Sequence, residues 1–242
     1  MHKIVYYHYG RLFIVLLLFS ILLYDGCVSE MPSKFTSEEE LARYLHVAGI
    51  NRACIGKGKN SGGVCTVDFS ESGLSDLTVL KGLPINSMVL SGSKIVDLRP
   101  LIGMPLIALS LVNTGVTDLS PLKEMPLKSL EIKGGVVEDI SPLKGMPLIS
   151  LQLSNTKVRS VSPLRGMPLK TLFLNDTVVT DLSPLKGMQL DYFTFTPSYV
   201  TNGLNIIREM KTLRGIGDPS MESPDRFWKR TQKSVEGTGI DE

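Results

Sequence analysis

Five Pro-Leu steps recur in this chain at a constant interval of 21 residues, and the surrounding sequence recurs with them. They begin at Pro100, Pro121, Pro142, Pro163 and Pro184. A fixed period of this length is the signature of an array in which each repeat forms one structural unit and stacks on the next. The repeat therefore predicts a solenoid.

Each repeat also contains two apolar residues separated by a single residue. Alternation with a period of two over so short a stretch indicates a strand. We expect seven short strands that stack in parallel along the solenoid. The apolar pairs are Val67/Phe69, Met88/Leu90, Leu109/Leu111, Leu130/Ile132, Leu151/Leu153, Leu172/Leu174 and Phe193/Phe195.

A small polar residue follows each strand, and an Asp-Leu-Ser-Pro-Leu-Lys-Gly segment comes next. Because a buried hydroxyl needs a hydrogen-bond partner, the small residues predict a ladder of bonds to the backbone of the neighbouring coil. The Ser is placed as a helix N-cap, the Pro as the first helical residue and the Gly as the stop, which leaves a single turn of 3₁₀ type. The ladder positions are Ser72, Ser93, Thr114, Gly135 (a gap), Thr156, Thr177 and Ser198, and the predicted N-caps are Ser120, Ser141, Ser162 and Ser183.

The consensus L-x-x-L-x-L-x-x-T-x-V-x-D-L-S-P-L-K-G-M-P resembles the leucine-rich repeat. It is similar to the short repeats of bacterial internalins, with Thr or Ser where that class has Asn and one residue fewer before the strand. The LSPLKGMPL wording also resembles secreted or envelope repeat proteins of planctomycete-like bacteria. Over residues 67–217 the resemblance implies an α/β horseshoe with a concave parallel β-sheet, convex 3₁₀ or short helical turns, and a helical cap at each end. It implies little about function, since leucine-rich repeats serve many ends.

The first 27 residues differ from the rest of the chain. A basic start precedes an apolar stretch from Leu12 to Tyr24, which is too short to span a membrane as a helix but suits a secretory signal. Cys27, directly after Gly26, resembles a bacterial lipobox, although Tyr24 and Asp25 depart from that motif. The resemblance implies acylation of Cys27; ordinary cleavage and a retained signal anchor are the alternatives. We therefore expect an exported protein of the cell envelope, held to the membrane by lipid or anchor.

Both ends of the array need caps, because the end coils would otherwise expose their apolar faces. Ser37 and Glu40 form a capping box before an amphipathic helix. Cys54 and Cys65 predict a disulfide in an exported protein and free thiols in the cytosol. The predicted segments are 1–27 (signal peptide with possible lipobox), 28–36 (linker), 37–66 (N-terminal cap with disulfide loop), 67–200 (repeats), 201–233 (C-terminal cap) and 234–242 (disordered tail).

The C-terminal cap is expected to contain a helix over about residues 202–210, then an edge strand. Phe227 and Trp228 are predicted to cover the last coil, with a ligand contact as the alternative.

Residues with catalytic or metal-binding chemistry are sparse. Beyond the first 27 residues the only histidine is His46, with no nucleophile motif near it, and one His with two Cys falls short of a zinc set. An aspartate precedes each helical turn, where capping explains it better than calcium binding. We predict no enzyme activity, no cofactor and no metal. A net charge of +2 with scattered basic residues offers no electrostatic reason for nucleic acid to bind.

The outward strand positions form the candidate binding surface. Most are small and polar, and the exceptions lie in mid-array and toward the C-terminal end. We predict a non-enzymatic interaction module that binds a protein or glycan through its concave sheet. The alternative is a structural envelope protein without a ligand, in which Phe173 simply packs on Tyr192 as its cross-strand neighbour. The candidate binding residues are Glu131, Lys133, Gln152, Phe173, Asn175 and Tyr192.

Overall fold

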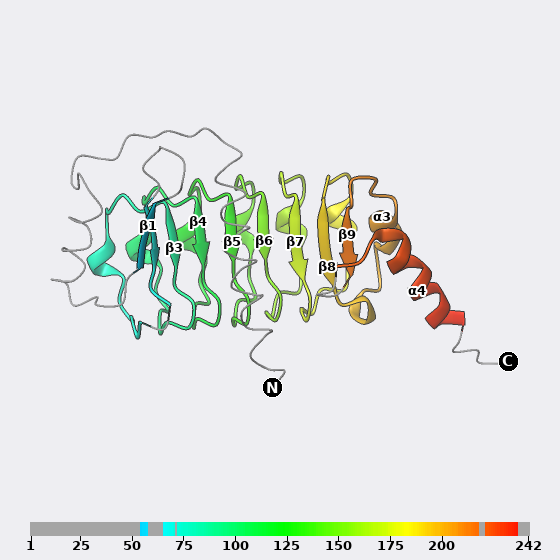
Figure 1. Ribbon diagram of the computed structural model, residues 1–242, viewed down its shortest axis with the longest axis horizontal. Coiled ribbons are helices and arrows are strands. Elements are labelled where there is room, and N and C mark those ends of the chain that lie inside the picture. Colours follow the sequence, from blue (N-terminus) through cyan, green and yellow to red (C-terminus); the bar gives the residue numbers. More distant parts are fainter. Residues whose placement is uncertain (1–53, 58–64, 71, 218–220, 237–242) are drawn as a thin grey trace.

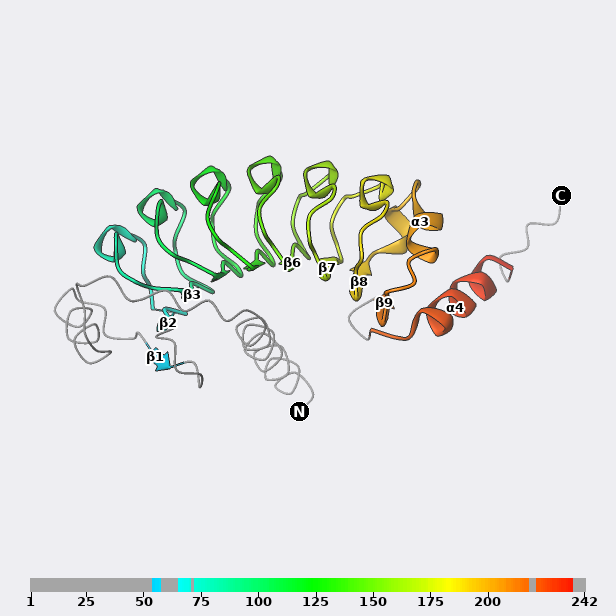
Figure 2. The same ribbon diagram turned by 90° about the horizontal axis from the view of Figure 1, so that it is seen from above.

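The computed structural model describes residues 54–57, 65–70, 72–217 and 221–236, and these form an open solenoid (Figure 1). Seen from above, the coils follow an arc, with the strands on its inner side and the 3₁₀ turns spread along its outer side (Figure 2). The predicted signal peptide, Cys27, the linker and the helix of the N-terminal cap lie outside the described residues.

One sheet of nine strands runs through the molecule in chain order. The strands β2 to β9 are parallel, while β1 pairs antiparallel with β2. The seven predicted strands are confirmed as β2 to β8, β9 is the expected edge strand, and β1 is an addition that the repeat did not predict. The strands are β1 (Cys54–Lys57), β2 (Cys65–Asp68), β3 (Ser87–Val89), β4 (Ala108–Ser110), β5 (Ser129–Glu131), β6 (Ser150–Gln152), β7 (Thr171–Leu174), β8 (Tyr192–Phe195) and β9 (Gly215–Gly217).

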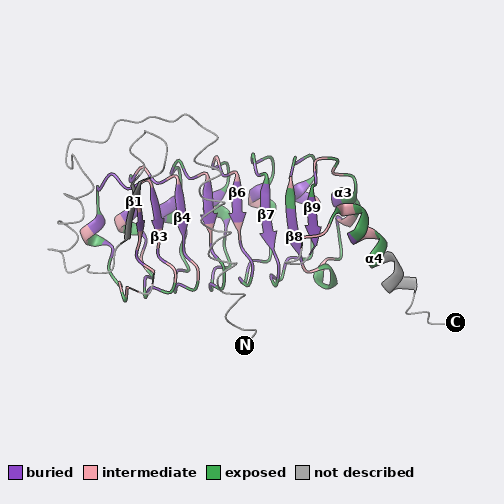
Figure 3. Ribbon diagram, viewed as in Figure 1, coloured by how far each residue is buried: buried purple, intermediate pink, exposed green. Residues whose placement is uncertain are grey.

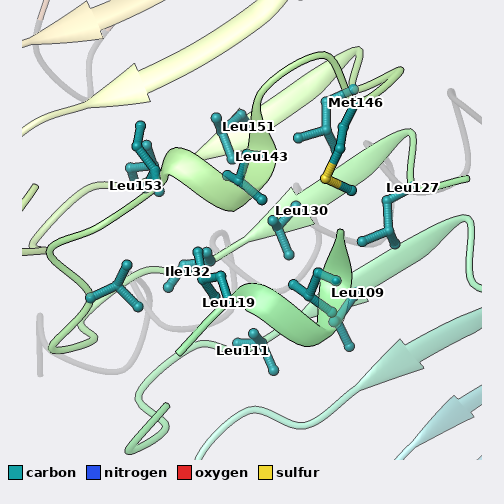
Figure 4. Close-up of a cluster of buried hydrophobic side chains, with 14 of the residues drawn as sticks. Leu109, Leu111, Leu119, Leu127, Leu130, Ile132, Leu143, Met146, Leu151 and Leu153 are labelled. Carbon is teal, nitrogen blue, oxygen red and sulfur yellow. The ribbon is translucent and has the colours of Figure 1, made fainter. Parts of the chain in front are cut away.

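The core is continuous because the register advances by one repeat at each step. Leu130, for example, lies opposite Leu109 on one side and Leu151 on the other. Leucines of the strands and of the 3₁₀ turns meet in the interior, where Leu130 is 1% and Leu143 0% exposed (Figure 4). Buried residues occupy the strands along the whole solenoid (Figure 3), so each coil closes the core of its neighbours.

The hairpin between β1 and β2 corrects one prediction. Its register places Cys54 opposite Asp68 and Cys65 opposite Lys57. The two cysteines are thus three residue steps apart along the strands, or about 10 Å at ~3.4 Å per residue. A disulfide needs Cα atoms within roughly 7 Å. The predicted Cys54–Cys65 bond is therefore incompatible with this pairing.

Each coil carries a single 3₁₀ turn, as predicted, but serine does not cap it. Ser120 is the first residue of its turn, and its backbone N–H and hydroxyl donate to Asp118 at 2.8 and 2.9 Å. A serine already inside the turn cannot cap it, whereas an aspartate two residues earlier can close an Asx turn. Equivalent bonds are made by Asp76, Asp97, Asp139 and Asp181. The turns are η1 (Thr78–Leu80), η2 (Arg99–Leu101), η3 (Ser120–Leu122), η4 (Ser141–Leu143), η5 (Ser162–Leu164) and η6 (Ser183–Leu185).

The residue that ends each turn adopts a left-handed backbone. Gly145 has φ +75°, and the equivalent position in the third coil is Glu124, with φ +65°. The glycine stop is confirmed at Gly145, Gly166 and Gly187. A second left-handed position, which the sequence analysis did not identify, follows the strands at Gly92, Asn113, Gly134, Asn155 and Asp176.

The hydroxyl ladder exists, but its bonds stay within each coil. Thr114, Thr156 and Thr177 donate to the carbonyl three residues earlier, at 2.9, 2.6 and 2.8 Å. The expected bonds to a neighbouring coil are wrong, because the turn after each strand already brings that nearer carbonyl within reach. The Ser93 hydroxyl is buried without a partner, and the predicted gap at Gly135 is also buried.

The C-terminal end is closed by α3 (Leu204–Arg208), β9 and α4 (Pro224–Glu236), after a last 3₁₀ turn η7 (Pro197–Tyr199). Phe227 is 1% exposed, and its ring centroid lies 5.9 Å from that of Phe195. The aromatic cover expected for the last coil is thus present. Helix α4 runs to Glu236, three residues into the segment predicted as a disordered tail, so that boundary is corrected.

Candidate functional site: the concave sheet

The outward side chains of the strands build the concave face. Because successive strand residues point to opposite sides, residues paired in register form rows that run across the sheet. The central row, one residue from each of β2 to β9, changes in chemistry from coil to coil. Its members are Asp68, Val89, Ser110, Glu131, Gln152, Phe173, Thr194 and Gly217.

Glu131 lies in the middle of this row. Ser110 donates a hydrogen bond of 3.0 Å to its Oε2, and the Ser110 hydroxyl lies 3.2 Å from that of Ser91. Burial raises the pKa of the Glu131 carboxyl, while the bond from Ser110 and the charge of Lys133 act in the opposite direction. A chain of bonds across three coils therefore holds a half-buried carboxylate on the sheet.

Gln152 and Phe173 continue the row toward the C-terminus. The Gln152 side-chain oxygen accepts hydrogen bonds from the backbone N–H and the hydroxyl of Ser154, at 3.1 and 2.7 Å. Phe173 lies between Gln152 and Thr194 in register and is 9% exposed. An acidic, an amide and an aromatic side chain therefore occupy three consecutive coils, each held by its neighbours.

Two predicted members lie in the next row, and Tyr192 lies apart. Lys133 is exposed, and Asn175 accepts a hydrogen bond from Thr194. Tyr192 is 38% exposed and pairs with Thr171 and Gly215, so it is not the register neighbour of Phe173. A Cβ placed on Gly215 would lie 3.0 Å from Cδ1 of Tyr192, which puts the ring over the glycine. Phe173 and Tyr192 are therefore diagonal neighbours on adjacent strands, and the expected direct cross-strand pairing is wrong.

A row of small side chains forms the floor beside the central row. Ser87, Ser129, Ser150 and Thr171 are 1% to 8% exposed. Parallel strands lie about 4.8 Å apart, so side chains of the neighbouring strands flank these small residues closely. In the central row, Glu131 and Gln152 are half-buried and rise above this floor, whereas Phe173 is nearly as buried as the floor itself.

The described residues provide little for other kinds of site. Within them, no group of three or more His, Cys, Asp or Glu side chains could hold a metal ion. A search of the same residues finds no helix that is long and apolar enough to cross a membrane.

Parallel strands that alternate with 3₁₀ turns at a period of 21 residues define a leucine-rich-repeat solenoid. No protein-family model and no curated protein sequence matches this chain. Among solved structures it is similar to internalin C2 of Listeria monocytogenes, with 31% identity over 50% of this chain and 66% of that one, at a TM-score of 0.46. It is also similar to an internalin of the same species, with 22% identity over 63% of this chain and 53% of that one, at a TM-score of 0.51.

The chain thus spans two thirds or less of these neighbours. The second likeness confirms the fold expected from the repeat.

Sequence reasoning found the members of the concave face but missed the Ser91–Ser110–Glu131 chain. The signal was present, because Ser110 and Glu131 are 21 residues apart and therefore occupy equivalent positions in adjacent coils. The side-chain rotamers that join them are not encoded in the period.

Proposed function

We propose that this protein is a non-enzymatic interaction module that binds a protein partner through its concave sheet. The central row at Glu131, Gln152 and Phe173 is the observation that supports the proposal. These side chains are held by hydrogen bonds and register neighbours before any partner arrives, so little conformational entropy remains to be lost on binding.

The chemistry of the row favours a protein partner. A half-buried carboxylate can accept hydrogen bonds from amide, ammonium or guanidinium groups, and the exposed part of Phe173, although small at 9%, adds an apolar contact two coils away. Lys133 and Tyr192, which are more exposed, would lie at the rim of such an interface.

We further propose that the module is exported and tethered to the membrane through its N-terminal segment. This rests on the basic start, the apolar stretch and Cys27 in the sequence. A chain recovered from its own cells would then begin at an acylated Cys27, and intact mass measures this directly.

The binding proposal is tested by quantitative cross-linking in native cells with two double variants. Lys133→Glu with Tyr192→Ser alters the concave rim, and Lys94→Glu with Tyr199→Ser makes the same chemical changes at exposed positions elsewhere. A specific partner should be lost with the first variant and retained with the second. Equal recovery with both variants would refute binding through the concave face.

A further inference from the structure

A row of cations runs along the convex face, where four consecutive 3₁₀ turns end. The residue directly after η3, η4, η5 and η6 is Lys123, Lys144, Arg165 and Lys186 in turn, and all four are exposed. Neighbouring turns approach within 8 Å between Cα atoms, so these residues follow one another along the arc. We call these four residues the cation row.

An acidic row lies at the opposite ends of the same turns, and it is interrupted once. Asp118, Asp139 and Asp181 each accept hydrogen bonds from the serine two residues later. In the coil of η5 the equivalent residue is Ser160, whose hydroxyl accepts the Ser162 N–H at 3.2 Å. The turn is therefore capped there without a negative charge.

The interruption falls within the longest stretch of the chain that has no acidic residue. Residues 140–175 contain five Lys or Arg residues and no Asp or Glu, although the net charge of the whole protein is only +2. Arg159, which precedes the uncharged cap, is exposed. Positive charge is thus concentrated around η4 and η5.

Few internal partners compensate the cation row. Lys123 lies 3.9 Å from the exposed Glu124. Arg165 helps to lower the pKa of Asp181, after the stronger effect of hydrogen bonds from Ser183. In the described part of the chain no ion pair engages Lys144 or Lys186.

We propose that the cation row binds a linear acidic polysaccharide along the convex face. The turns that precede these cations approach within 8 Å between Cα atoms, which is comparable to the Debye length of roughly 8–10 Å at physiological ionic strength, so the potentials of successive cations overlap along the arc. A flexible polyanion that follows the row releases counterions at each contact. The acidic row on the other side of the turns restricts the polymer to one line. Binding there leaves the concave face free, so this inference does not depend on the proposed function.

Two other polyanions fit the row less well. Nucleic acid would benefit from exposed aromatic side chains for stacking, and the exposed aromatics of the described residues, Tyr192 and Tyr199, belong to the last coil. A planar anionic membrane would meet a convex arc at only a few coils (Figure 2), whereas a polymer can follow it.

The first test compares two triple variants of the full chain for binding to immobilised polygalacturonate, a carboxylated polysaccharide. Lys144→Gln, Arg165→Gln and Lys186→Gln neutralise the row, and Lys94→Gln, Lys211→Gln and Lys229→Gln remove the same charge from scattered exposed positions. Affinity should fall about 10-fold or more in the row variant and about 2-fold or less in the control, because only contacted cations release counterions. Equal losses of affinity in the two variants would show that only the net charge of the protein matters, and they would overturn the proposal.

The second test restores the missing carboxylate. Ser160→Asp should cap η5 as aspartate caps the other turns, so thermal stability is maintained, yet polygalacturonate affinity should fall several-fold. Ser160→Asn supplies a capping oxygen without charge and should bind like the wild type. Unchanged affinity in Ser160→Asp would refute the proposal, and so would tighter binding of the wild type to poly(dT) or to anionic vesicles than to polygalacturonate.

Discussion

The two faces of the solenoid differ in how strictly they repeat. On the convex face the same residue types return in nearly every coil because the backbone requires them: an aspartate closes the 3₁₀ turn and a glycine adopts positive φ. On the concave face the backbone conformation does not require a particular residue type. The equivalent position in four consecutive coils is therefore occupied by different residues, Ser110, Glu131, Gln152 and Phe173. Variation where structure imposes no choice is what a recognition surface requires.

The comparison also applies to exceptions on the convex face. Where structure favours one residue type, a departure is informative because it forgoes stability. Glu124 departs from glycine and retains a strained backbone, whereas Ser160 departs from aspartate and keeps the cap while losing a charge. Only the second exception changes the surface potential without straining the fold.

The largest loss of stability is expected from a substitution in the hydrophobic core, which supports both faces. Leu130→Ala removes a side chain that is 1% exposed and should lower the free energy of unfolding by about 2–5 kcal/mol, because it leaves a cavity between coils. Ser129→Ala, on the same strand but facing outward, should change it by less than about 0.5 kcal/mol. Chemical denaturation measures both; similar losses would show that the concave floor is not permissive.

A smaller effect is expected at the left-handed position that ends each turn. Gly145→Ala should cost about 1 kcal/mol, since Gly145 has φ +75° and an L residue is strained there. Glu124→Gly should gain roughly as much by relieving the same strain in the third coil.

A steric clash does not contribute to the effect of Gly145→Ala, because no atom lies within 4 Å of a Cβ built on Gly145. Denaturation midpoints should therefore move in opposite directions for the two substitutions. Shifts of the same sign would show that backbone strain is not what separates the two coils.

The sequence specified the repeated parts of this structure because a period constrains every coil at once. Strand positions, 3₁₀ turns and the glycine stop all followed from it. The period assigned the cap of the 3₁₀ turn to the wrong residue, because Ser120 and Asp118 recur with the same interval. Only the backbone path shows that the Asp118 carboxylate accepts the hydrogen bond from the Ser120 N–H. The separation of Cys54 and Cys65 could not be predicted either, because the β1–β2 hairpin occurs once and no repeat indicates its register.

The candidate site was predictable as a list but not as an arrangement. Periodicity identified Glu131 and Phe173 as outward residues. It could not show that Ser110 holds the carboxylate, or that the ring of Tyr192 lies over Gly215. Such contacts depend on rotamers and on the end of the array, where the repeat no longer applies.

The turn that joins the two faces offers a third comparison between coils. Thr156→Val removes a buried bond of 2.6 Å to the Leu153 carbonyl and should cost about 0.5–1.5 kcal/mol. Ser93→Ala, at the equivalent position three coils earlier, removes a buried hydroxyl that has no partner and should leave stability equal or slightly higher. Thermal unfolding measures both. A larger loss for Ser93→Ala would mean that its hydroxyl has a partner in solution.

The smallest expected effect is electrostatic, and it has opposite signs on the two faces. Burial raises the pKa of Glu131, so its stabilising contribution is complete below its unfolded value of about 4.5 and is lost as pH rises through the folded pKa. Hydrogen bonds from the backbone and side chain of Ser141 lower the pKa of Asp139, so its contribution is present above about 3.8 and is lost as pH falls through the folded pKa.

Two isosteric substitutions should therefore diverge at neutral pH and converge in acid. Glu131→Gln keeps an acceptor for Ser110 and should unfold at a slightly higher temperature than the wild type at pH 7, because it removes a desolvated charge. Asp139→Asn should unfold at a slightly lower temperature at pH 7, because its amide is a weaker acceptor than a carboxylate. In a series of melting curves, the Glu131 difference should vanish below about pH 4.5, and the Asp139 difference should shrink as the pH falls from about 3.8 through the lowered folded pKa of Asp139. A stabilising effect of the Glu131 charge at pH 7 would show that Lys133 outweighs desolvation, and the concave face would then carry an ion pair in place of an open carboxylate.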